Sequence, residues 1–374
     1  MAGAAGPQNV PRWVSAGLLP LVNLLAAFIV SGLVIWAIGE NPFRALAILL
    51  NGAFGYGEGI GFTLYFTTNF MFTGMAVAIA FHCGLFNIGG EGQATLGGLG
   101  VGLVLLWLDF LPFILILPIA IIAAIVFGGA WAFLPGYLQA KRGSHVVITT
   151  IMFNFIAATL MVYLLSQVLI KPGQMSPETR EFLPHTWLPF AHEMFAWVGI
   201  DIPRSPWNFS FVIALVAGFF LWVFVWHTRW GYEIRTVGAN QRAAVYAGIS
   251  PSRNIILAMA ISGGLAGMLG LNEIMGVNHR ILLNFSAGYG FVGIAVSLMG
   301  RNHPVGIVLA SLLFGALFQG GGDLAFEMPK ITREMVVVIQ GLVILFAGAL
   351  EYLFWPYLAA IFRRPAPLGA APME

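Results

Sequence analysis

The stretch 208–228 reads NFSFVIALVAGFFLWVFVWHT and contains no lysine, arginine, aspartate or glutamate. A helix that crosses the hydrocarbon core of a membrane needs about 20 mainly apolar residues, because its backbone polar groups must be satisfied within the helix. This stretch has that length and that composition. We therefore expect a membrane-spanning helix here, and this expectation decides the fold class of the chain.

The composition of the whole chain extends the same conclusion. Of the 374 residues, 59% are hydrophobic and 9% are charged, whereas soluble domains carry about 25% charged residues. Membrane lipid is therefore the solvent for much of the surface. Nine further candidate spans lie at 14–38, 62–82, 94–108, 112–134, 146–170, 254–275, 286–300, 304–319 and 335–356. We predict an all-α, polytopic membrane protein with about ten spanning helices in one domain, residues 1–374.

The positive charges predict the orientation, because lysine and arginine are enriched in cytoplasmic loops. With both termini in the cytoplasm, the cytoplasmic segments hold ten of the 17 basic residues and four of the 15 acidic ones. The basic residues are Arg12, Lys141, Arg142, Arg229, Arg235, Arg242, Arg253, Arg301, Arg363 and Arg364, and the acidic ones are Glu91, Glu233, Glu351 and Glu374. Residues 171–207, rich in proline and tryptophan, then form an extracytoplasmic loop, either an aromatic-anchored cap or a structured connector.

Motifs for enzymatic chemistry are absent from the sequence. There is no G-x-x-x-x-G-K-[ST], and none of the three lysines follows a glycine, so we do not expect the chain to hydrolyse ATP itself. The histidines show no metal-ligand spacing, and the net charge of +2 is too small to suggest nucleic-acid binding. Residues 288–293 match G-x-G-x-x-G but lie in an apolar segment, where small residues favour helix packing. We predict no catalytic residues, metal or cofactor.

Residues 81–93 interrupt two apolar runs with four glycines and three polar side chains, Asn87, Glu91 and Gln93. A carboxylate at membrane depth costs about 2.5–3.5 kcal/mol on insertion scales, and irregular backbone is tolerated there only beside a cavity or inside protein. One interpretation is a broken or re-entrant helix whose polar groups face a solute path. The other is a short cytoplasmic turn made tight by its glycines.

Residues 229–253 form the longest basic loop on the predicted cytoplasmic side. Asn240 is a good N-cap and Gly248 a good C-terminal stop, which predicts a short helix over about 241–247. Ser250 and Pro251 then begin the next helix. Small residues such as Ala243 allow close docking to a partner. We predict a coupling helix; a solvated connector is the alternative.

Other polar residues lie within apolar runs. Asn154 predicts a hydrogen bond across a helix interface or, alternatively, a solute contact. Glu273 is expected in water at the membrane interface, with the outer vestibule as the alternative. Small residues recur every four positions along 254–275 and predict a close-packed face; they are Ala258, Ser262, Ala266 and Gly270.

These segments together resemble a known family. Residues 86–93, FNIGGEGQ, look like the N-I-G-x-E-G-Q signature of ABC-importer permeases of the branched-chain amino acid and simple-sugar group. Residues 237–249 resemble the cytoplasmic loop of that family that faces the ATPase, and residues 293–304 resemble its G-I-A-V-A-L-L-G-x-x-x-P segment. The nucleoside or simple-sugar branch is the nearest by the first signature. Gly90 departs from the larger apolar residue that is common there.

The resemblance implies a permease subunit in a bacterial inner membrane. Its implied partners are a second, related permease, two cytoplasmic ATP-binding subunits and an extracytoplasmic solute-binding protein. We hypothesise that the residues that line or brace the solute path are Phe86, Asn87, Glu91, Gln93 and Asn154. We hypothesise that the ATPase-coupling residues are Glu233, Arg235, Gly238, Asn240, Ala243, Tyr246 and Gly248. Nucleosides are the first expectation for the solute, followed by simple sugars and branched-chain amino acids; a stand-alone secondary transporter or channel is the alternative class.

Overall fold

The computed structural model describes all residues except 1–10, 12–13, 347–352 and 363–374. Five of the charged residues used for the predicted orientation therefore lie outside the described residues: Arg12, Glu351, Arg363, Arg364 and Glu374. By its internal contacts the chain divides into two compact units. The larger comprises residues 49–323, and the smaller comprises residues 1–48 with 324–374.

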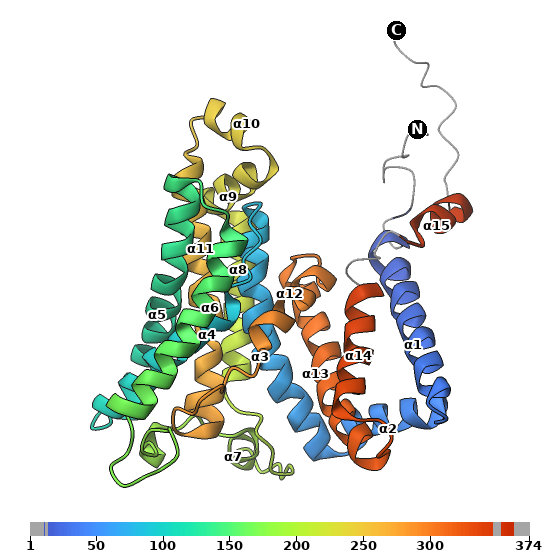
Figure 1. Cartoon of the computed structure of the whole chain (residues 1–374), viewed down its shortest axis with the longest axis horizontal. Coiled ribbons are helices and arrows are strands. Elements are labelled where there is room, and N and C mark those ends of the chain that lie inside the picture. The colour runs from blue at the N-terminus through green and yellow to red at the C-terminus, as the bar shows by residue number, and fades with distance from the viewer. Residues whose placement is uncertain (1–10, 12–13, 347–352, 363–374) are drawn as a thin grey trace. The chain divides into compact units, whose positions relative to one another are not determined.

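The larger unit is a bundle of long helices (Figure 1). Its helices are α3 (Gly57–His82), α4 (Gly90–Trp107), α5 (Phe113–Arg142), α6 (Val146–Tyr163), α8 (Ser210–His227), α11 (Pro251–Gly267), α12 (Tyr289–Met299) and most of α13 (Pro304–Glu327). Two are extended by π-helical turns, α6 by Leu164–Val168 and α11 by Leu271–Asn278. Two short helices, α9 (Arg229–Ala239) and α10 (Gln241–Tyr246), lie together at one end, and α7 (Ala191–Ala196) lies at the other.

The smaller unit is built from the two ends of the chain. Its helices are a π-helical turn (Val14–Leu18), α1 (Leu19–Ala37), the start of α2 (Pro42–Phe54), α14 (Arg333–Ile344) and α15 (Trp355–Phe362). The chain bends by 119° between α1 and α2. Ile35, Ala45, Ile331 and Ile339 belong to its apolar core, so the two ends of the chain are joined by a common buried cluster.

The described residues contain helices and one isolated β-bridge but no strand, which confirms the all-α prediction. Among the described residues, six helices are long and apolar enough to cross a membrane, and the bent α1–α2 pair gives a seventh if it counts as one span. Each of the ten predicted spans overlaps a helix in the described residues, and residues 347–352 of the last predicted span lie outside them. Helices α12 and α14 are short, with 11 and 12 residues, and α4 begins with the polar signature. The count of ten spans and the N-in/C-in orientation stay predictions.

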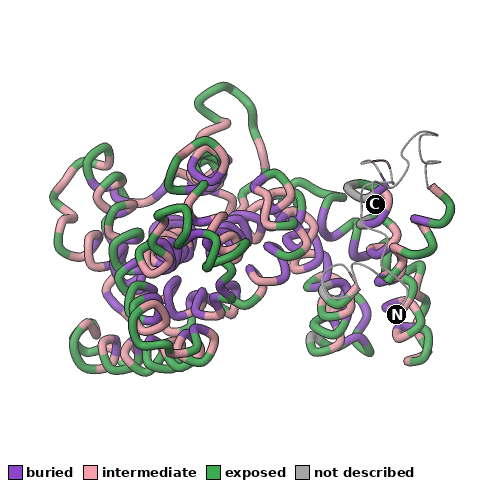
Figure 2. The backbone as a smooth tube through the Cα atoms, turned by 90° about the horizontal axis from the view of Figure 1, so that it is seen from above, coloured by how far each residue is buried: buried purple, intermediate pink, exposed green. Residues whose placement is uncertain are grey.

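Small residues bring the central helices into contact, and the buried backbone follows the middle of the bundle (Figure 2). Ala258, Ser262 and Ala266 are fully buried, as the four-residue spacing predicts. A Cβ atom at Gly263 of α11 would overlap the backbone of Gly128 in α5. This close approach explains how α11 is enclosed without large side chains.

The predicted extracytoplasmic loop is docked onto the end of α11. Backbone amides of Phe182 and Leu188 donate hydrogen bonds to the carbonyl oxygens of His279 and Met275, at 2.8 and 3.1 Å. The indole of Trp187 stacks on the imidazole of His279, with ring centroids 3.7 Å apart. Residues 171–207 are therefore structured and packed against the end of this helix, with α7 as their one short α-helix.

Candidate solute path and coupling segment

The signature segment is a seven-residue connector, 83–89, followed by the first turn of α4. Gly84 has φ +73°, a left-handed conformation that glycine adopts without steric cost. The amide of Asn87 donates to Gln93 Oε1 at 2.9 Å and to the Ser262 hydroxyl at 2.8 Å. Its own Oδ1 accepts from the Gly89 backbone N–H at 2.9 Å. Asn87 and Gln93 are 0% and 1% exposed, so they fasten the connector to α4 and α11.

Asn154 of α6 holds the same segment from the other side. Its Oδ1 accepts the backbone N–H of Gly92 at 2.9 Å, and its amide donates to the Ile88 carbonyl oxygen at 2.9 Å. The first N–H groups of a helix have no partner within that helix, and Asn154 supplies one from a neighbouring span. Phe86 differs from these residues: its ring is 38% exposed and stacks on Phe81.

Glu91 joins α4 to the start of α12. Its carboxylate accepts three hydrogen bonds, from the Ser286 hydroxyl at 2.7 Å and from the backbone N–H groups of Gly288 and Gly290 at 2.9 Å each. A carboxylate at a helix N-terminus is favoured both by these donors and by the helix dipole. A Cβ atom at Gly90 would lie 3.2 Å from the Gly290 carbonyl oxygen. This close contact gives a physical reason for the small residue at Gly90.

A polar cavity of about 90 Å³ opens beside the Glu91 carboxylate. Its walls include Glu91, Thr95, Asn154 and Ser286, with Met161 and Phe285 as apolar neighbours. Of the five predicted solute-path residues, the structure thus places Glu91 and Asn154 at one cavity, buries Asn87 and Gln93 beside it, and leaves Phe86 half-exposed on the connector.

A second buried polar cluster lies around Glu273, which the sequence analysis placed in water. That expectation is wrong, because Glu273 is 4% exposed. Its carboxylate accepts from the Tyr65 hydroxyl at 2.5 Å and from the Asn69 amide at 2.6 Å. The neighbouring Asn272 is bonded to Asn69 and to Asn208, each at 2.8 Å. The sequence signal for Tyr65 and Asn69 was the set of polar residues spaced along the apolar run of α3.

The predicted coupling segment, residues 229–253, contains the predicted short helix, α10, with the predicted caps. The Asn240 side chain accepts the backbone N–H groups of Arg242 and Ala243 at 2.9 and 3.1 Å. Gly248 has φ +75°, and the Ser250 hydroxyl accepts the Arg253 N–H at the start of α11. The apolar residues of α10 are largely outside the core: Ala243 is exposed and Tyr246 is 94% exposed.

The structure adds α9, an eleven-residue helix that the sequence analysis missed. Glu233 on α9 pairs with Arg229 at 2.9 Å and accepts from the Asn254 amide of α11 at 3.3 Å. The hydrogen bond from Asn254, together with the Arg229 guanidinium, lowers the pKa of the Glu233 carboxyl. Arg235 is half-buried on the same helix. Thus α9 is tied to α11 by a polar contact.

The coupling segment and the signature connector touch through glycine. A Cβ atom at Gly238 of α9 would overlap the carbonyl oxygen of His82, and one at Gly84 would lie 3.2 Å from the Gly238 Cα atom. Backbone therefore lies directly against backbone at this point, and there is no side chain between them to absorb a displacement. Sequence spacing gave no sign of this contact, because 154 positions separate the two glycines.

Comparison of the sequence with known proteins assigns the chain to a transport system. The profile of a family described as the permease component of the branched-chain amino acid transport system matches residues 59–348. The chain belongs to this family. It is thus a permease subunit of the ABC-transporter type and a multi-pass protein of the inner membrane. No solved structure matches the chain.

Named relatives match nearly the whole chain. A guanosine ABC transporter permease of Bacillus subtilis is 34% identical over 333 residues, covering 89% of this chain and 93% of the relative. A nucleoside ABC transporter permease of Lactococcus lactis is 33% identical, covering 88% and 90%. A glucose ABC transporter permease of Haloferax volcanii is also 33% identical, covering 92% and 90%.

Proposed function

We propose that this permease forms part of the transmembrane path of an ATP-driven importer for nucleosides or a related small polar solute. In this proposal it works with a second permease, two cytoplasmic ATP-binding subunits and an extracytoplasmic solute-binding protein. Relatives whose names give guanosine and nucleosides as solutes support the solute class. Simple sugars are the second candidate, because a glucose permease is similarly related.

The observation that carries the proposed mechanism is the contact between Gly238 and the His82–Gly84 backbone. An ATPase docked on α10 would move α9, and α9 would push on the connector without intervening side chains. The connector is bonded through Asn87 to Ser262 of α11, and α11 itself follows the coupling segment. A single displacement would therefore act on α3, α4 and α11 together.

Within the path we assign separate roles to the signature residues. Asn87, Gln93 and Asn154 brace the connector, because their polar atoms are used on one another and on backbone. Glu91 faces the polar cavity and anchors α12. Binding at this cavity can be weak, since the solute-binding protein would supply affinity before delivery.

The proposal is tested with proteoliposomes that contain the complete complex, its solute-binding protein and internal ATP. We expect accumulation of labelled guanosine, competed by other nucleosides and not by glucose or leucine. Competition by glucose alone would assign the sugar branch instead. Vesicles with this permease alone are expected to show no accumulation.

The alternative class, a secondary transporter, would use the buried carboxylate of Glu273, which Tyr65 and Asn69 hold by hydrogen bonds. An ionisable group at such depth is a default candidate for ion coupling. The same vesicles decide this point. If the permease alone accumulates solute in a proton or sodium gradient, without ATP or partners, the importer proposal is wrong.

A further inference from the structure

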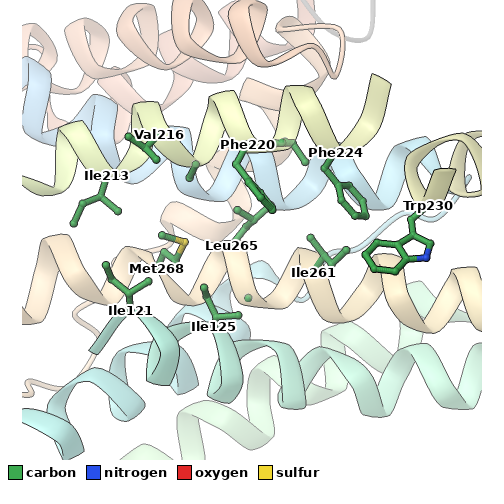
Figure 3. A pocket seen from close by; sticks show the side chains of 13 residues that line it. Ile121, Ile125, Ile213, Val216, Phe220, Phe224, Trp230, Ile261, Leu265 and Met268 are labelled. Atoms are coloured by element: carbon green, nitrogen blue, oxygen red, sulfur yellow. The ribbon is translucent and has the colours of Figure 1, made fainter. Parts of the chain in front are cut away.

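An apolar groove lies between α5, α8 and α11 in the larger unit (Figure 3). Its volume is about 460 Å³. Ile121 and Ile125 of α5, Val216 and Phe220 of α8, and Leu265 and Met268 of α11 line it, and Trp230 of α9 lies at one end. Apart from the Trp230 indole nitrogen, the lining side chains are hydrocarbon or thioether.

The floor of the groove is one face of α11. Arg253, Ile256, Leu257 and Ala260 line an adjoining hollow of about 310 Å³, which also includes Trp230. Ile261, Gly264, Leu265 and Met268 continue into the groove. Spacings of three and four place these residues on a single helix face. Because α11 is otherwise mostly buried, this face is the part of the helix that a molecule from the membrane can reach.

The length of this face matches one leaflet of a bilayer. From Arg253 to Met268 a helix rises about 22 Å at 1.5 Å per residue. Half of a bilayer measures about 15 Å of hydrocarbon and about 20–22 Å with its polar interface. The apolar part of the face fits an acyl chain, and the charged end falls at the depth of a phosphate.

The charges at that end favour an anion. Arg253 is exposed at the first turn of α11, and the exposed guanidinium of Arg229 lies next to Trp230 in sequence. Glu233 offsets Arg229 through their 2.9 Å ion pair, which leaves the charge of Arg253 in excess. A tryptophan beside basic residues is also typical of the membrane–water interface.

We propose that this groove binds an anionic phospholipid, with an acyl chain against α8 and α11 and the phosphate at Arg253. Helices α8 and α11 lead into and out of the coupling segment, so a chain between them would set their separation. That effect on transport rests on the proposed function, whereas the binding site itself does not.

The site is tested by native mass spectrometry of the full-length permease, titrated with phosphatidylglycerol and phosphatidylcholine of identical acyl chains. We expect phosphatidylglycerol to bind about fivefold more tightly, since one arginine at a membrane surface contributes about that factor. Arg253→Gln should remove the preference without weakening phosphatidylcholine binding. Arg142→Gln, an exposed arginine at the end of α5, is the matched control and should retain it.

A second pair of variants tests the apolar part. Ala217 lines the groove, and Leu215 lies on α8 outside it. Ala217→Trp should fill the groove and reduce binding of both lipids at least fivefold, whereas Leu215→Trp should bind as wild type does. Equal affinity of the wild type for the two lipids would overturn the proposal. So would an Ala217→Trp variant that loses association with a second permease chain while its lipid binding is unchanged.

Discussion

The signature connector and α10 are both polar interruptions of apolar sequence, yet they are opposite in structure. On the connector, Asn87 and Gln93 are 0% and 1% exposed and are bonded to each other. On α10, Val245 and Tyr246 are 59% and 94% exposed. Buried polar networks fix one geometry when they are fully satisfied, whereas contiguous exposed apolar residues are typical of interaction sites. The first region thus fastens the connector to its neighbours, and we propose that the second is a docking surface; the Gly84–Gly238 contact joins them.

Among substitutions that test this difference, we expect the largest change in stability at Asn87 on the signature connector. Asn87→Leu leaves the Gly89 N–H and Gln93 without a partner in a buried site, which costs about 1–3 kcal/mol per group. We expect the free energy of unfolding, measured by denaturant titration in micelles, to fall by about 3 kcal/mol. Gln241→Leu, an exposed amide on α10, should change it by less than about 0.5 kcal/mol. Equal effects of the two substitutions would contradict the distinction.

We expect the second-largest change in stability at Glu91, whose carboxylate holds the start of α12. Glu91→Gln keeps the shape of the side chain but directs an amide N–H₂ toward a backbone N–H donor. Hydrogen bonds to charged groups contribute about 1.5–3 kcal/mol, so we expect a loss of about 2 kcal/mol in unfolding free energy and about tenfold in uptake. Glu58→Gln, at an exposed carboxylate on α3, is the control. Wild-type uptake by Glu91→Gln would show that the anchor has no role in transport.

On α10, we expect a substitution to change stability little but to weaken binding of the ATP-binding subunit. Tyr246→Ala removes an exposed ring, so the free energy of unfolding should stay within about 0.5 kcal/mol of wild type. Loss of an aromatic contact at an interface often costs more than 1 kcal/mol, which predicts about tenfold weaker co-purification of the ATP-binding subunit. Tyr163→Ala, at an exposed ring on α6, should leave co-purification unchanged; an equal loss there would remove the docking assignment.

The smallest effect is a pH dependence at Glu233. Because Asn254 and Arg229 lower its pKa in the folded protein, its stabilisation is present above the unfolded-state pKa, about 4.3. It is lost as the pH falls through the lower folded-state pKa. Thermal denaturation curves of wild type and Glu233→Gln should therefore differ near pH 7 and converge at strongly acidic pH. A difference that grows on acidification would contradict the sign.

Local sequence signals predicted the ends of the short helix α10 and the start of α11. Asn240, Gly248 and Ser250 cap as expected because capping depends on residues a few positions apart. The four-residue spacing at Ala258 and Ser262 likewise follows from helix geometry.

Contacts between distant segments were not predictable in the same way. Glu273 was expected in water because its partners, Tyr65 and Asn69, lie about 200 positions away on α3. The three donors of Glu91 also come from a distant segment, residues 286–290. A single sequence gives the polarity of such groups but not which of them face one another.

The central claim is that force passes from α9 to the connector through Gly238, and its most direct test is ATP-driven guanosine uptake by the complete complex carrying Gly238→Val. The added side chain must displace the His82–Gly84 backbone. We predict uptake near background with normal co-purification of the ATP-binding subunits, while Ala239→Val, at the exposed neighbouring position, transports normally. Wild-type uptake by Gly238→Val would contradict the account.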